Sequence, residues 1–286
     1  MVMFLDYYYP FAGLCNQLYL ITNHIHAAYN TSQKIYIHRF NTDIFKKERV
    51  PVCEVFNITK TNENLKQLTG VYLLEPEMPE IVISIPKLCI YPVSSIEILN
   101  CLEFNDTIID RVNTIKIELP FYNAVHFRLD IDSVIHYTFG KSVYDKFMDL
   151  CNNNIHLALE YYYTLNHESI EQWCQFLLKQ YFQFILQFGF DKPWYICTSI
   201  TKWKIHDPMI PKLKQFTDFI LNCGGSYYIP CKQYPQRELN ALVDLLVLRD
   251  SEKMIGFEGS SFSEGYCLKV NSIRKVTKEY LFVKEK

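Results

Sequence analysis

The sequence predicts an α/β fold made of two doubly wound lobes that face each other across a cleft. Short apolar runs, typical of buried strands, alternate with longer segments in which apolar residues recur at helical spacing. This alternation occurs twice, once near the N-terminus and again after residue 123. Strand–helix–strand units imply parallel sheets, because the chain must cross back before the next strand begins.

The first lobe is expected to begin with a strand–helix–strand unit. Val2–Tyr8 is a short apolar run, and Pro10–Gly13 interrupts it. A helix is indicated next by apolar residues at helical spacing: Leu14, Leu18, Ile21, Ile25 and Ala28. Lys34–Phe40 then alternates as a second strand does. Residues 41–118 give no clear pattern, because prolines interrupt their short apolar runs.

The second lobe is expected to follow a division at residue 120. Its predicted strands are Ala124–Phe127, Trp194–Thr198, Tyr227–Ile229 and Lys253–Phe257. Its predicted helices span residues 141–151, 155–188, 208–222 and 236–249, with another beginning near 261. Strands and helices alternate throughout, as in a doubly wound sheet.

Composition excludes several classes of protein. The net charge is −2 and no block of Lys and Arg occurs, so we expect no nucleic-acid partner. No apolar run is long enough for a transmembrane segment, and no signal peptide is evident. The ten cysteines are spread out without a Cys-x-x-Cys pair, which argues against a zinc site. Free thiols among apolar neighbours predict a cytoplasmic protein.

The most informative stretch follows the last predicted strand of the second lobe. Gly256 and Gly259 allow a close backbone approach to a ligand. The hydroxyls of Ser260, Ser261 and Ser263, on either side of Phe262, come next at a predicted helix start. Helix N-termini bind anions because their first N–H groups have no partner. The stretch therefore predicts a binding site for a diphosphate.

A second segment supplies a cation. His126 and Arg128 alternate with apolar residues in a predicted strand that runs to 128, so both side chains share one face. Arginine suits bidentate contact with phosphate oxygens and keeps its charge at physiological pH. His126 is expected to bind the ligand or to fix Arg128. The alternative is a structural ion pair between Arg128 and a nearby aspartate.

Asp130 and Asp132 form an Asp-x-Asp motif just after this strand. In one class of glycosyltransferases such a pair holds Mg²⁺ or Mn²⁺ under a nucleotide diphosphate. Arg128 offers the alternative, since it can neutralise a diphosphate without metal. In the first lobe, Gly13 and Asn16 lie between a predicted strand and helix, where open sheets bind ligands. A simple N-cap turn explains that loop equally well.

Together these motifs resemble a known family. Gly13-x-x-Asn16-Gln17 comes first, His126-x-Arg128-x-x-x-Asp132 second, and Val243-Asp244-Leu245 with Ile255-Gly256-x-x-x-Ser260-Ser261-Phe262-Ser263 last. Their order and spacing resemble the GDP-fucose-dependent fucosyltransferases, and most closely the protein O-fucosyltransferase branch. The resemblance implies a GT-B fold, with an acceptor-side lobe over 1–120 and a nucleotide-sugar lobe over 121–286. It also implies an inverting reaction that requires no metal or other cofactor.

The resemblance further implies residue roles. Arg128 would bind the donor diphosphate and stabilise it as it leaves, and Asn16 would approach it from the first lobe. The remaining donor-site residues would be Gly13, His126, Asp132, Asp244, Ser260, Ser261, Phe262 and Ser263, with Asp244 toward the base. A relative carries Glu just before the N-terminal glycine, where this chain has Ala12. The catalytic base is therefore Asp130, Asp132 or Asp43, or no side-chain base exists.

The expected partners are a nucleotide sugar and a glycan acceptor. GDP-fucose is the first-choice donor, and UDP-xylose or another UDP-sugar is the alternative. With no membrane anchor evident, the sequence resembles those of glycosyltransferases from large DNA viruses or protists, which build glycans in the cytosol. Two further alternatives remain: a metal-dependent GT-A transferase that uses Asp130 and Asp132, and a non-catalytic protein that binds nucleotides or carbohydrates.

Overall fold

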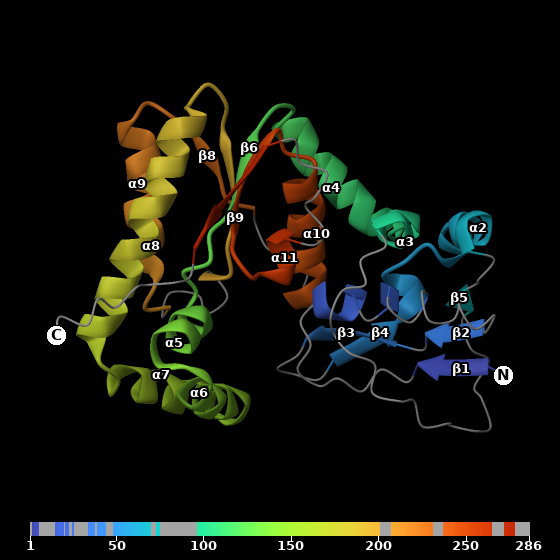
Figure 1. Cartoon of the computed structure of the whole chain (residues 1–286), viewed down its shortest axis with the longest axis horizontal. Helices are drawn as coiled ribbons and strands as arrows, with labels where there is room; N and C mark the ends of the chain where they lie inside the picture. The colour runs from blue at the N-terminus through green and yellow to red at the C-terminus, as the bar shows by residue number, and fades with distance from the viewer. Residues whose placement is uncertain are drawn as a thin grey trace. The chain divides into compact units, whose positions relative to one another are not determined.

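A computed structural model gives the fold of the chain (Figure 1). It describes residues 2–5, 15–19, 21–22, 25, 34–37, 39–43, 48–69, 73–74, 96–200, 207–230, 237–264 and 272–277. The chain divides into two compact units. Unit 1 comprises Met1–Ile115 and Lys232–Leu246, and unit 2 comprises Lys116–Cys231 and Val247–Lys286. The division of functional lobes at residue 120 stays a prediction.

Unit 1 contains a three-stranded parallel sheet. β2 (Lys34–Ile37) lies between β1 (Val2–Leu5) and β5 (Leu73–Leu74), and both neighbours run parallel to it. Between β1 and β2, the described residues 15–19, 21–22 and 25 are helical, with Leu18, Ile21 and Ile25 buried. This arrangement confirms the predicted strand–helix–strand unit, because a parallel pair needs a crossover between its strands.

The second predicted strand of unit 1 is shorter than expected. Residues 39 and 40 belong instead to β3 (Arg39–Asp43), which pairs antiparallel with β4 (Glu48–Pro51). The stretch that gave no sequence pattern also forms a short 3₁₀ turn and three helices. These are η1 (Val52–Glu54), α2 (Ile58–Thr69), α3 (Ile96–Cys101) and α4 (Asp106–Glu118). The buried rings of Phe40, Phe56 and Phe104 pack together here.

Unit 2 contains a five-stranded parallel sheet in the order β10-β9-β6-β7-β8. Its strands are β6 (Asn123–His126), β7 (Trp194–Cys197), β8 (Tyr227–Tyr228), β9 (Lys253–Phe257) and β10 (Ser272–Val276). The chain starts at the centre, moves outward through β7 and β8, and returns to the other side of β6 as β9 and β10. This is a doubly wound sheet whose order reverses between β6 and β9.

Unit 2 also contains the following six described helices, and α10 connects β8 to β9. They are α5 (Ile131–Phe139), α6 (Lys141–Asn153), α7 (Ile155–Tyr163), α8 (His167–Phe188), α9 (Ile210–Asn222) and α11 (Ser261–Glu264). α10 spans Arg237–Arg249, and its residues up to 246 group with unit 1.

Two sequence-based boundaries in unit 2 are wrong, and one strand was not predicted. A single helix was expected over 155–188, but α7 ends at Tyr163 and Asn166 caps a new helix by accepting a hydrogen bond from the Ser169 N–H. The strand expected to reach 128 ends at His126, and α5 follows it. β10 was not predicted, because its exposed Arg274 and Lys275 disguise an edge strand.

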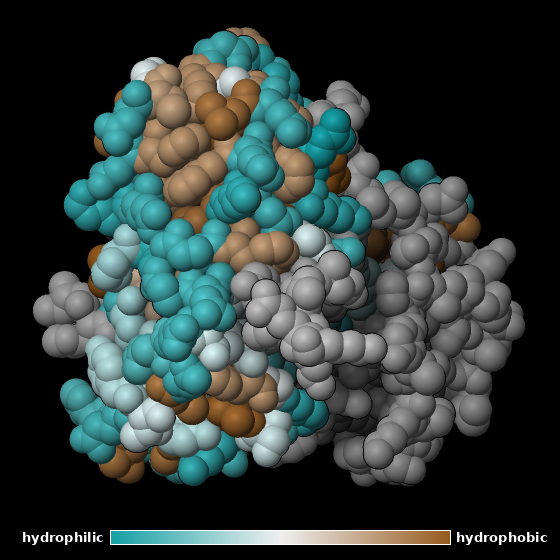
Figure 2. Space-filling model, turned by 60° about the vertical axis from the view of Figure 1, so that its left-hand side comes forward, coloured by the Kyte–Doolittle hydropathy of each residue, from teal (hydrophilic) through white to brown (hydrophobic). Residues whose placement is uncertain are grey.

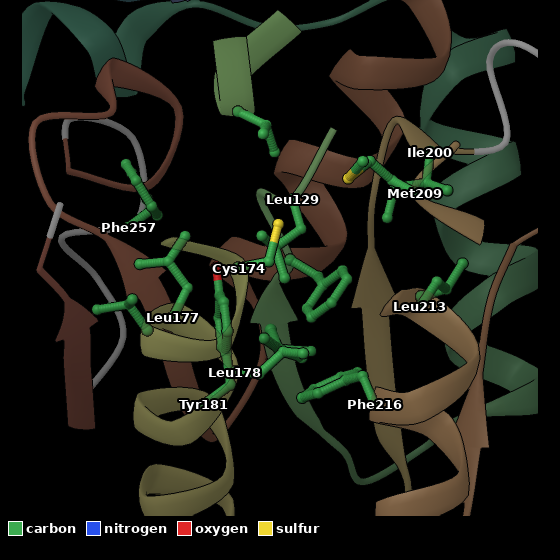
Figure 3. Close-up of a cluster of buried hydrophobic side chains, with 14 of the residues drawn as sticks. Leu129, Cys174, Leu177, Leu178, Tyr181, Ile200, Met209, Leu213, Phe216 and Phe257 are labelled. Carbon is green, nitrogen blue, oxygen red and sulfur yellow. The ribbon is translucent and has the colours of Figure 1, made fainter. Parts of the chain in front are cut away.

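The core of unit 2 lies between its sheet and α8 (Figure 3). Leu177, Leu178 and Tyr181 of α8 are fully buried. The Tyr181 ring lies 5.1 Å from the Phe127 ring and 5.7 Å from the Phe216 ring, measured between centroids. Rings at such separations contribute favourably beyond the area that they bury. The segment just beyond β6 is therefore held by the central core.

The surface of unit 2 carries both apolar and polar regions. On the face shown in Figure 2, brown apolar patches are separated by teal polar side chains. None of the described helices is both long enough and apolar enough to cross a lipid bilayer. Every cysteine in the described ranges is a free thiol, as predicted, and burial raises the pKa of Cys174 to about 12.

Candidate functional site

The carboxyl ends of β6 and β9 meet at the point where the strand order of unit 2 reverses. The two strands pair directly, with Ala124 opposite Met254 and Val125 opposite Ile255. β6 leads into α5 and β9 leads into α11 (Figure 1). Open parallel sheets bind ligands at this edge, in the crevice at the reversal point. The two segments singled out in the sequence, 126–132 and 256–263, therefore meet where a ligand is expected.

Ser263 connects the two segments. Its Oγ lies 3.3 Å from the His126 Nδ1, accepts a hydrogen bond from the Phe257 N–H at 3.0 Å, and lies 3.1 Å from the Phe257 carbonyl. A Cβ on Gly256 would lie only 3.1 Å from the Cβ of Ser263. The sequence predicted that Gly256 admits a ligand. The structure shows instead that the space beside it is occupied by Ser263.

His126 is neutral at physiological pH. It is buried, and the Phe262 ring lies 4.8 Å away between centroids. Burial, together with the charge of Arg128, lowers the pKa of His126 from 6.5 to about 3, although Asp130 opposes this shift. A neutral imidazole donates or accepts one hydrogen bond at each nitrogen. The geometry therefore favours hydrogen bonding by His126 over acid–base catalysis.

The lowered pKa of His126 predicts a pH-dependent stability. Its pKa is lower in the folded than in the unfolded protein, so the unfolded chain takes up the proton first as the pH falls. The free energy of unfolding should therefore fall below pH 6.5, by up to about 1.4 kcal/mol per pH unit from this group, and His126 should contribute no slope above it. Urea unfolding at pH 7.5, 6.5, 5.5 and 4.5, run on wild type and His126→Gln, measures the difference. Equal slopes in the two proteins would contradict the burial of a neutral His126.

Arg128 lies just beyond β6, half-buried, beside two buried aspartates. Its Nε is buried and has no hydrogen-bond partner among the described residues. Burial alone would lower the pKa of Arg128, but the carboxylates of Asp130 and Asp132 outweigh it and hold that pKa above its ordinary value. A guanidinium has five N–H donors, so a charged neighbour does not exhaust it. Arg128 thus has the charge and a free donor for an anionic ligand.

Asp130 is fully engaged with protein groups. It is the N-cap of α5, where its Oδ1 accepts a hydrogen bond from the Ser133 N–H at 3.0 Å. Its Oδ2 accepts one from the Ser199 Oγ at 2.8 Å. Burial would raise the pKa of Asp130, but the charge of Arg128 and these hydrogen bonds hold it well below its usual range. Such a carboxylate is a weak base, so the geometry favours a structural role for Asp130 over base catalysis.

The Asp-x-Asp segment contributes to a helix start. Asp132 is buried in the first turn of α5, where a negative charge is favourable. In the part of the chain that the structure describes, no three His, Cys, Asp or Glu side chains come together as a metal-binding group. The motif that suggested a metal site in the sequence is accounted for by an N-cap and a first-turn carboxylate.

The remaining predicted site residues belong to several elements of the two units, and one of them lies outside the described residues. Ser260 is buried beside β9, whereas only the backbone of Ser261 is described. Asn16 is half-buried on a helix of unit 1, and Asp43 ends β3 in the same unit. Asp244 is buried on α10, in the stretch that groups with unit 1. Gly13 lies outside the described residues. The roles of these residues stay predictions.

Sequence reasoning missed two residues that shape the site. Ser199 follows β7 and donates to Asp130, and its position beyond a strand end could have revealed it. Tyr181 lies in the middle of α8, and its hydroxyl reaches the backbone beyond β6. Nothing in its sequence neighbourhood distinguishes Tyr181 from an ordinary core residue.

Comparison with known proteins bears on the fold of the chain. No protein-family model matches the sequence. No curated protein matches it either. Among solved structures, the chain is similar to the crystal structure of POFUT1, a protein O-fucosyltransferase, in its apo form. The similarity has a TM-score of 0.55 at 12% sequence identity, and it covers 96% of this chain and 97% of that one. The fold is therefore α/β and of the GT-B kind, as predicted.

Proposed function

We propose that this protein is a glycosyltransferase that binds the diphosphate of a nucleotide sugar at the carboxyl edge of the unit 2 sheet. One observation carries the proposal. At the reversal point of a doubly wound sheet, Arg128 keeps its charge and a buried donor without a partner among the described residues, two residues beyond the His126 that contacts Ser263. The GT-B fold shared with an O-fucosyltransferase supports the same class of reaction.

The chemistry suits an arginine at this place. When the sugar–phosphate bond breaks, negative charge develops on the diphosphate. A cation fixed before the reaction stabilises that charge without reorganisation. Asp130 and Asp132 help to hold the Arg128 side chain charged, and the half-buried setting strengthens its interaction with an anion. His126, neutral and hydrogen-bonded, supplies a polar group beside it.

The finer assignments are part of the proposal. GDP-fucose is the first-choice donor, with UDP-xylose or another UDP-sugar as the alternative, and a glycan is the acceptor. The reaction is proposed to invert the anomeric centre without a metal. Gly13 and Asn16 are proposed to approach the diphosphate, and Asp244 to support the side of the site that binds the nucleobase. Asp132 or Asp43 is proposed as the catalytic base, and a reaction without a side-chain base is the alternative. A cytoplasmic location, supported by free thiols at every described cysteine, belongs to the same proposal.

The two alternative functions, a GT-A transferase and a non-catalytic binding protein, are distinguished by fold and by turnover. A GT-A transferase has a different architecture, and the fold here is of the GT-B kind. A non-catalytic binding protein of this fold would need the same diphosphate site without turnover. Hydrolysis or transfer of a nucleotide sugar above background separates that function from a transferase.

A thermal-shift screen tests the proposed function. GDP, GDP-fucose, UDP and UDP-xylose are each added with Mg²⁺ and with EDTA. A ligand present at 100 times its dissociation constant stabilises the folded protein by about 2.7 kcal/mol, which raises Tm measurably. We expect a nucleotide sugar to raise Tm equally under both conditions. Stabilisation that EDTA abolishes would refute metal independence, and no shift with any of the four would refute the donor site.

Ser263→Ala is expected to weaken nucleotide-sugar binding. Ser263 is buried and ties His126 to the end of β9, so its loss frees the imidazole and leaves the Phe257 N–H without its acceptor. An unpaired buried donor costs about 1–3 kcal/mol, which predicts lower stability as well. Calorimetric titration with the best ligand of the screen measures the affinity. Ser251→Ala is the matched control, because that buried hydroxyl donates to the Leu248 carbonyl at the end of α10. Equal affinities in the two variants would count against the site.

A further inference from the structure

The hydroxyl of Tyr181 joins two backbone groups that flank Phe127. It donates a hydrogen bond to the His126 carbonyl at 2.8 Å and accepts one from the Arg128 N–H at 3.1 Å. The Phe127 N–H between them bonds to the Cys197 carbonyl of β7 at 2.8 Å. The backbone just beyond β6 is therefore held from two directions, by the neighbouring strand and by α8.

Tyr181 is well suited to hold this backbone rigidly. It lies in the middle of the longest described helix of unit 2, is fully buried, and points toward the sheet (Figure 3). Its ring packs against those of Phe127 and Phe216, which stack on each other. Burial raises the pKa of Tyr181 above its ordinary value, so the hydroxyl keeps its proton and remains a donor to the His126 carbonyl.

We propose that Tyr181 is a positioning residue for the donor site, because its hydroxyl fixes the backbone that carries His126 and Arg128. The inference rests on the proposed function, since it assigns a purpose to the placement of those two side chains. A phenylalanine would fill the same space against Phe127 and Phe216. Phenylalanine at this position would therefore lose only the two hydrogen bonds that the Tyr181 hydroxyl makes to the backbone.

Tyr122 offers a matched control within unit 2. It is also a buried tyrosine, and its hydroxyl donates to the Val247 carbonyl at 2.7 Å. It precedes β6, at the amino end of the strand, whereas Tyr181 acts at the carboxyl end. Tyr122→Phe and Tyr181→Phe therefore remove the same chemical group from opposite ends of one strand. A merely structural role predicts similar effects from the two changes.

The experiment compares wild type, Tyr181→Phe, Tyr122→Phe and Arg128→Ala with two measurements. Hydrogen exchange followed by mass spectrometry reports on the peptide covering 126–130 without any ligand. Hydrolysis of GDP-fucose and of UDP-xylose then gives kcat and KM, using whichever of these two donors wild type turns over faster. The exchange measurement needs no ligand and no turnover. The positioning role of Tyr181 can therefore fail while the proposed function stands.

We expect faster exchange over 126–130 in Tyr181→Phe alone. We also expect kcat to fall by about 10- to 100-fold, because small misplacements of a catalytic group are costly. KM should stay within about threefold, since Arg128 acts mainly on charge that develops in the transition state. Tyr122→Phe should lower Tm comparably and leave kcat unchanged.

Two results would overturn the inference and leave the proposed function standing. One is unchanged exchange over 126–130 in Tyr181→Phe. The other is unchanged kcat in that variant while Arg128→Ala loses activity. A wild-type protein that hydrolyses neither nucleotide sugar would overturn the proposed function and this inference together, and that result is known before any variant is compared.

Discussion

Replacing Arg128 with alanine is expected to lower the turnover of a nucleotide sugar by about 100- to 1000-fold, the usual effect of removing one fixed donor to developing charge. The expectation follows from the placement of Arg128. It lies at the reversal point of the unit 2 sheet, stays charged beside Asp130 and Asp132, and has a buried Nε without a partner among the described residues. Steady-state hydrolysis or transfer, measured below the Tm of the variant, gives the loss.

Two further variants separate charge from geometry. Arg274→Ala removes the same charge from an exposed position on β10 and should leave turnover unchanged. Arg128→Lys keeps a cation beside Asp130 and Asp132 but lacks the planar fork that binds two phosphate oxygens at once. We expect it to retain most of the stability and to lose part of the turnover. An Arg128→Ala protein as active as Arg274→Ala would remove the basis of the proposed function.

Replacing Asp130 with alanine is expected to lower the free energy of unfolding by about 2–4 kcal/mol. Three losses combine. The Ser133 N–H loses the N-cap acceptor of α5, and the part-buried Ser199 contact disappears. Arg128 also loses the charge that most strongly offsets its burial. Urea unfolding at pH 7, followed by tryptophan fluorescence, measures the change.

Another N-cap of unit 2 calibrates this value. Asn166 caps α8 by accepting from the Ser169 N–H at 3.1 Å, in an exposed setting without a buried charge. Asn166→Ala should cost about 1 kcal/mol, the ordinary value of a cap. Asp130→Asn keeps a good cap and removes only the charge, so it should fall between the two. If Asp130→Ala costs no more than Asn166→Ala, the charge of Asp130 has no structural role.

Much of the fold was predictable, because its signals are local. The strand Lys253–Phe257 matched its predicted bounds, and α9 (Ile210–Asn222) was found from apolar spacing alone. Errors arose where periodicity continues across a break. The apolar pattern of 155–188 runs through Asn166, although α7 ends at Tyr163 and the Asn166 side chain caps the start of α8. An N-cap acts through one hydrogen bond, which hydrophobic spacing does not register.

The candidate site was likewise predictable in its residue types but not in its contacts. Residue types and spacing predicted Arg128, His126 and the serines after β9 as site residues, because phosphate chemistry restricts which residues serve. Their mutual contacts were not predictable. That Ser263 turns back onto His126, and occupies the space that Gly256 leaves open, depends on two strands brought together from far apart in the chain.

The sequence by itself determined the class of fold, the two segments that carry the polar groups, and the presence of an arginine among them. Only the tertiary structure decided that Ser199 holds Asp130 and that Tyr181 fixes the backbone beside Arg128. The physical reason is the separation along the chain over which each kind of signal acts. Propensity and spacing act within a few residues, whereas these contacts join groups that become neighbours only when β6, β7 and α8 pack together.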